Sequence, residues 1–209
     1  MAAELNMLIL GIGNILWADE GFGVRAVEEM QRRYRFPENV RLLDGGTQGI
    51  YLVDQVRAAD VLVVFDAVDY GLPPGAMKQV EGDQVPKFMG AKKMSLHQTG
   101  FQEVLAMAEL MGDYPGHLLL IGVQPVELED FGGSLRPEVK GRIDQAIDRA
   151  LDYLAVFGVV PTPSVDADDR GVESAQAALT LACYESGRPS EAQACRIGDA
   201  RVLSRRVTT

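Results

Sequence analysis

The chain has 209 residues, of which 47% are hydrophobic and 24% charged, a composition typical of a water-soluble globular domain. Its formal net charge of -10 argues against nonspecific binding to nucleic acid, which needs basic surface to neutralise phosphates. No apolar run approaches the roughly 20 residues that a membrane helix needs. We therefore expect neither nucleic acid nor a membrane as a partner. The apolar stretch 7–12 is too short for a signal peptide, so we expect a cytoplasmic location.

The first half of the chain alternates apolar runs with helical patterns. Residues 5–11 form an apolar run, broken only by Asn6, that ends at a glycine, which predicts a buried strand. Apolar residues at helical spacing predict a helix over about 21–34. A second strand at 40–44, a short helix at 50–58 and a third strand at 61–66, apolar up to its last residue, Asp66, follow.

The second half continues the alternation. A short edge strand is predicted at 76–80, and the next helix is expected to begin at Thr99, with Gln102 completing a capping box. Another buried strand is predicted at 117–123. The last regular helix is expected to start near Pro137, which suits a first helical position, and to stop near Gly158.

This alternation predicts an α/β fold: a three-layer sandwich with a mostly parallel twisted sheet covered by helices on both faces. Right-handed crossovers place every strand-to-helix loop at the same edge of the sheet, where ligands bind in open α/β folds. If the first three strands lie in the order 2-1-3, the first and third are neighbours. Glu20, which follows the first strand, and Asp66, which ends the third, would then lie close together.

A composition change after Gly158 predicts a domain at 1–159 and a flexible C-terminal extension at 160–209. Proline-rich 161–164 and acidic 166–169 are typical of a linker, and residues 171–183 would form at most a weak helix. Both cysteines, Cys183 and Cys195, lie in this extension and match no zinc pattern. A lone compact domain favours a monomer.

Glu20, Asp66 and His97 stand out among the polar residues. Two carboxylates and an imidazole make a plausible site for a divalent transition metal. Each has an ordinary structural reading: Glu20 near a helix N-terminus, Asp66 capping a loop, and His97 bonded to a backbone carbonyl. The other histidine, His117, opens a strand without acidic neighbours in sequence and is interpreted as structural.

Other kinds of site find less support. Gly11-Ile12-Gly13 at a strand end resembles part of a dinucleotide fingerprint, with Asp44 in the place of the ribose-binding acid, but Leu16 replaces the third glycine. We therefore expect no nucleotide. The motifs of zinc and serine hydrolases, HExxH and GxSxG, are absent.

Five short motifs, in order, resemble those of the nickel–iron hydrogenase maturation endopeptidases: residues 8–14 with 19–24, then 44–49, 65–69, 95–98 and 121–125. The resemblance covers roughly residues 5–157. It implies an endopeptidase, classified as aspartic-type, that removes the C-terminal extension of the hydrogenase large-subunit precursor after nickel insertion. By motif it also implies that Glu20, Asp66 and His97 are the metal ligands.

The resemblance implies further that the nickel is carried by the substrate and recognised by the enzyme. The second glycine-rich loop follows the second strand and is expected to border the same crevice, so we interpret Asp44, Gly45, Thr47 and Gln48 as substrate-binding residues. The alternative is a noncatalytic nucleotide-binding or metal-chaperone module on a Rossmann-like sheet.

Overall fold

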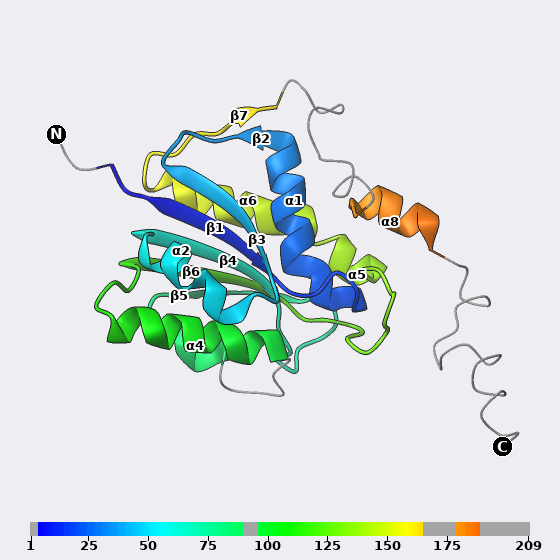
Figure 1. Ribbon diagram of the computed structural model, residues 1–209. Helices are drawn as coiled ribbons and strands as arrows, with labels where there is room; N and C mark the ends of the chain where they lie inside the picture. Colours follow the sequence, from blue (N-terminus) through cyan, green and yellow to red (C-terminus); the bar gives the residue numbers. More distant parts are fainter. Residues whose placement is uncertain (1–3, 90–95, 165–178, 189–209) are drawn as a thin grey trace, which may run out of the picture.

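The computed structural model describes residues 4–89, 96–164 and 179–188, and for 87–89 and 96–99 it describes only the backbone. Its centre is a five-stranded sheet in the order β3-β1-β4-β6-β5 (Figure 1). Four strands are parallel: β1 (Met7–Ile12), β3 (Val40–Gly46), β4 (Val61–Ala67) and β6 (His117–Val123). β5 (Met77–Glu81) runs antiparallel at the edge. The predicted fold class and the edge strand are confirmed, and the order 2-1-3 on which the closeness of Glu20 and Asp66 was made conditional is the order found.

Helices cover both faces of the sheet (Figure 1). α1 (Phe22–Arg33) and α6 (Ile143–Ala155) lie on one face. A short 3-10 helix, η1 (Ala18–Gly21), precedes α1, and the short helix α5 (Pro137–Lys140) precedes α6. The other face carries η2 (Gly49–Leu52), α2 (Val53–Arg57), α3 (Gln84–Met89) and α4 (Leu96–Leu110). Within the described residues, no helix is both long and apolar enough to cross a membrane.

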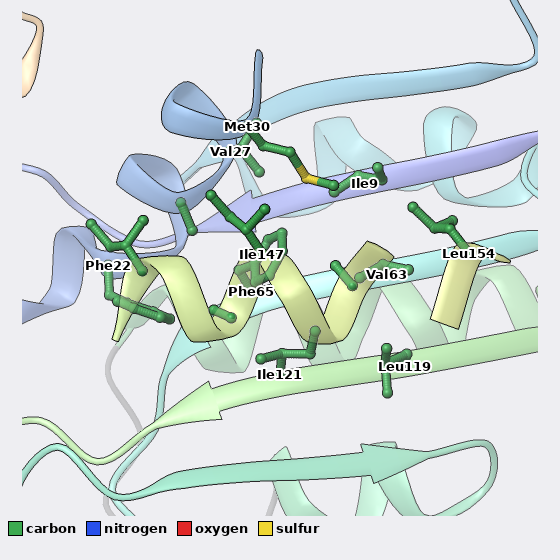
Figure 2. Close-up of a cluster of buried hydrophobic side chains, with 14 of the residues drawn as sticks. Ile9, Phe22, Val27, Met30, Val63, Phe65, Leu119, Ile121, Ile147 and Leu154 are labelled. Atoms are coloured by element: carbon green, nitrogen blue, oxygen red, sulfur yellow. The ribbon is translucent and has the colours of Figure 1, made fainter. Parts of the chain in front are cut away.

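The apolar strands divide their side chains between two cores because successive residues of a strand point to opposite faces. In β4, Val63 and Phe65 pack toward α1 and α6, whereas Leu62 and Val64 pack toward α2 and α4. Figure 2 shows the first core, where Ile147 and other residues of α6 lie over the strands. Burial on both faces explains why these strands are apolar throughout rather than alternating.

Several element boundaries differ from the sequence prediction. α4 begins at Leu96 rather than Thr99, so His97 lies in its first turn. The helix expected from Pro137 onward is divided into α5 and α6 at Gly141-Arg142. The helix predicted over about 21–34 is confirmed as α1, Phe22–Arg33, and Tyr34–Arg35 directly after it forms a short strand, β2.

The C-terminal extension departs most from expectation. β7 (Thr162–Pro163) pairs antiparallel with β2, where a flexible linker was predicted. Of the weak helix predicted at 171–183, residues 171–178 lie outside the described part of the structure. Its last three residues belong to α8 (Leu181–Gly187). Glu185 of α8 accepts hydrogen bonds from Ser134 (2.9 Å) and Lys140 (2.7 Å). Both described parts of the extension therefore contact the domain, and the boundary at residue 159 stays a prediction.

Candidate functional site

The carboxyl ends of the parallel strands meet at one edge, and the turn after β1 brings Glu20 there. Glycine is needed at position 13, whose φ is +132° and where a Cβ would collide with the Glu20 carbonyl oxygen. Gly23 allows a second close approach, because a Cβ there would collide with the carbonyl oxygens of Ile12 and Phe65. These glycines pack the start of α1 directly onto the ends of β1 and β4.

Asp19 fixes this turn to the loop after β6. Its side chain is fully buried, and one carboxylate oxygen accepts hydrogen bonds from the N–H groups of Val126 (2.8 Å) and Glu127 (2.9 Å). The other oxygen accepts one from the N–H of Arg136 (2.7 Å). The Asp19 N–H donates in turn to the Glu127 carbonyl (3.1 Å). Asp19 therefore has a structural role: it fixes the backbone next to the half-buried Glu20. The sequence analysis did not identify this role.

Asp66 lies near the end of β4 and is fully buried. In the sheet register Asp66 is paired with Gly122 of β6, while its neighbour Phe65 is paired with Gly11 of β1. The turn that carries Glu20 contacts β4, so the structure places the segments bearing Glu20 and Asp66 side by side. This is the neighbourhood that the strand order predicted.

Tyr70, which lies near Asp66, is another residue that the sequence analysis did not identify. A Cβ on Gly122 would collide with its hydroxyl, so the glycine makes room for the phenol. Burial, and to a lesser degree the negative charge of Asp66, raises the pKa of Tyr70, which keeps the phenol protonated. The Tyr70 N–H donates to Gln124 (2.8 Å), which fixes the loop after β4 to the end of β6.

The backbone of His97 lies in the first turn of α4. Slightly further along that helix, a Cβ on Gly100 would lie 3.4 Å from Gly49 Cα, so α4 near Gly100 lies against the last residue of the loop 44–49. The side chain of His97 is outside the described part of the structure. Among the side chains that are described, no group of three His, Cys, Asp or Glu residues is arranged to hold a metal ion. The ligand role of the trio stays a prediction.

The loop 44–49 adjoins the turn before Glu20, since the N–H of Gly13 donates to the Gly46 carbonyl (3.0 Å). The Asp44 carboxylate accepts a hydrogen bond from the Gly46 N–H (2.8 Å), and the Gln48 amide donates to the Asp44 carbonyl (3.2 Å). Desolvation raises the pKa of Asp44, although the Gly46 bond opposes it. Thr47 and Gln48 are exposed, whereas Gly45 is buried and offers only its backbone.

His117 lies at the opposite edge of the sheet, at the start of β6. Its exposed ring packs against Phe157, with 4.8 Å between ring centroids. This placement fits the structural interpretation of His117.

Comparison with known proteins decides the family. Residues 24–153 match the family model described as hydrogenase maturation protease. This chain belongs to that family. It is 68% identical over 204 residues to the hydrogenase expression/formation protein HupD of Thiocapsa roseopersicina, covering 98% of this chain and 92% of that one. It is 39% identical over 160 residues to the hydrogenase 2 maturation protease of Escherichia coli, covering 76% and 96%.

The solved structures agree. The hydrogenase maturating endopeptidase HybD of E. coli has a TM-score of 0.73 at 37% identity, covering 78% of this chain and 99% of its own. Membership of the hydrogenase maturation protease family makes this chain a peptidase. The match to HupD of T. roseopersicina covers 204 of the 209 residues and therefore includes most of the C-terminal extension.

Proposed function

We propose that this peptidase removes the C-terminal extension of the nickel–iron hydrogenase large-subunit precursor once nickel has been inserted. Family membership and the relatives' descriptions support the class of substrate. The observation that carries the proposal is the juxtaposition of two segments at one sheet edge: the clamped turn bearing Glu20 and the strand end bearing Asp66.

The nickel belongs to the substrate, and Glu20, Asp66 and His97 are proposed to recognise it. Carboxylate and imidazole ligands bind divalent nickel, and three protein ligands leave coordination positions for the substrate. Because none of the three side chains is a thiolate, they bind free metal only modestly. They are therefore expected to bind nickel that the precursor already holds more strongly than free nickel. Cleavage thereby becomes conditional on metal loading.

The fixed backbone around Glu20 and Asp66 supports the proposal that these two ligands are preorganised. Because Asp19 and Gly13 fix the backbone of Glu20, and Asp66 is buried in a central strand, little ordering is left for the moment of binding. The adjoining loop supplies the exposed side chains of Asp44, Thr47 and Gln48 and the backbone of Gly45, which are proposed to contact the precursor. We further propose that the enzyme acts as a cytoplasmic monomer.

The direct test compares nickel-loaded and nickel-free precursor. Each is incubated with the wild-type enzyme, and the mass of the large subunit is measured over time. We expect the loaded precursor to lose its C-terminal extension and the nickel-free precursor to keep it. Equal cleavage of both would overturn nickel recognition, and cleavage of neither would overturn the processing function.

A further inference from the structure

Four apolar residues on the two joined loops beside Glu20 are partly or largely exposed, and we call them the Trp17–Phe131 patch. Leu16 and Phe131 are 40% and 63% exposed, Val126 is 44% exposed, and Trp17 is half-buried. The rings of Trp17 and Phe131 meet edge to face, with 5.2 Å between centroids. Exposed aromatic and aliphatic side chains that gather in this way mark interaction sites, whereas single exposed ones do not.

The patch is held in place by backbone contacts between two loops. Trp17 and Phe131 form an isolated antiparallel bridge, and the Gly132 N–H donates to the Leu16 carbonyl (2.7 Å). Asp19 holds the same two loops together through Val126 and its neighbours. A preformed surface of this kind binds without a large ordering cost, and aromatic anchors supply much of the affinity in such interfaces.

The surroundings of the patch are strongly acidic. The four described loops at this sheet edge, residues 13–21, 44–49, 66–76 and 124–136, hold eight carboxylates and one basic side chain, Arg136. Arg136 is already paired with Asp130 at 2.8 Å. The carboxylates are Asp19, Glu20, Asp44, Asp66, Asp69, Glu127, Glu129 and Asp130. Five of these carboxylates are at least partly exposed, namely Glu20, Asp44, Asp69, Glu127 and Glu129, whereas the other three are buried. Charge complementarity therefore favours a positively charged partner.

We infer that the Trp17–Phe131 patch docks an apolar segment of the precursor that is flanked by basic side chains. This inference rests on the proposed function. The patch adjoins Glu20, one of the proposed metal ligands, because the Glu20 N–H donates to the Trp17 carbonyl (2.9 Å). A segment bound on the patch continues across the turn that bears Glu20 toward the end of β4.

The test measures precursor binding and cleavage separately for Leu16→Ser and Phe131→Ser. The matched control is Leu110→Ser, since Leu110 is 82% exposed at the far end of α4. We expect each patch variant to raise KM and the dissociation constant about tenfold, with kcat within about twofold, and the control to change neither. The melting temperatures of the exposed-site variants are expected to match the wild type.

A charge reversal gives a second arm. Glu129 is exposed at the rim of the patch, so Glu129→Lys is expected to raise KM and to reduce its dependence on ionic strength. This inference alone would be overturned if the wild type cleaves the precursor and Leu16→Ser, Phe131→Ser and Glu129→Lys all keep the wild-type dissociation constant and KM. Binding of the precursor through the patch without cleavage would support the inference and overturn the proposed function instead.

Discussion

Replacing Asp19 by alanine tests whether the turn bearing Glu20 depends on the buried carboxylate. The change removes the acceptor of three backbone N–H groups, those of Val126, Glu127 and Arg136. A hydrogen bond to a charged group contributes about 1.5–3 kcal/mol, and the three bonds share one carboxylate, so their contributions do not add fully. We expect the free energy of unfolding to fall by about 3–5 kcal/mol, which is a large effect for one substitution.

The assay is urea denaturation at neutral pH, with processing of nickel-loaded precursor measured on the folded variant. Asp19→Asn, which keeps one acceptor oxygen, is expected to lose less stability than Asp19→Ala. Asp54→Ala is the matched control, because that carboxylate is 87% exposed and makes only a long ion pair with Arg57. Its change is expected to stay within about 0.5 kcal/mol. A loss below about 1 kcal/mol for Asp19→Ala would refute the reasoning.

Two further predictions concern the extension and the substrate loop. Truncation after Ser164 is expected to lower the free energy of unfolding by about 1–2 kcal/mol, because it removes α8 and its contacts with Ser134 and Lys140. Burial acts to raise the pKa of Glu185, but the hydrogen bonds from Lys140 and Ser134 prevail and lower it from 4.5. The Glu185 contribution is therefore present above pH 4.5 and lost as the pH falls through the lowered pKa, so the deficit of the truncated protein should shrink on acidification. A deficit independent of pH would contradict this role. Asp44→Asn is expected to leave the melting temperature nearly unchanged while altering the rate or choice of precursor, and unchanged processing of cognate and noncognate precursors would exclude a substrate role.

The sequence predicted the sheet well because burial on both faces leaves a direct mark. Three parallel strands, β1, β4 and β6, are nearly continuous apolar runs. The order of the first three strands entered the sequence analysis only as a condition, because local patterns do not report which strands are neighbours. The start of α4 was placed late because Thr99 resembles an N-cap, whereas the helix already begins at Leu96. The β2–β7 pair has two residues in each strand, too few for any periodicity to show.

The candidate site was predictable only in part. Residue types and strand ends indicated Glu20 and Asp66, since the carboxyl ends of neighbouring parallel strands share one edge. The roles of Asp19 and Tyr70 depend on partners far away in sequence, such as Arg136 and Gly122, and no local pattern reports such contacts. The docking of α8 depends in the same way on single polar contacts rather than on an apolar face.

The central claim, that Glu20, Asp66 and His97 together recognise the substrate's nickel, is tested most directly by C-terminal processing of nickel-loaded precursor. The variants are Glu20→Gln, Asp66→Asn and His97→Ala, with His117→Ala as the control histidine at the opposite sheet edge. Each of the three is predicted to fold and to cleave at least about 10–100-fold more slowly, because even supporting groups at metal sites contribute that much. His117→Ala is predicted to cleave at the wild-type rate. Cleavage at that rate by all three variants would contradict the account.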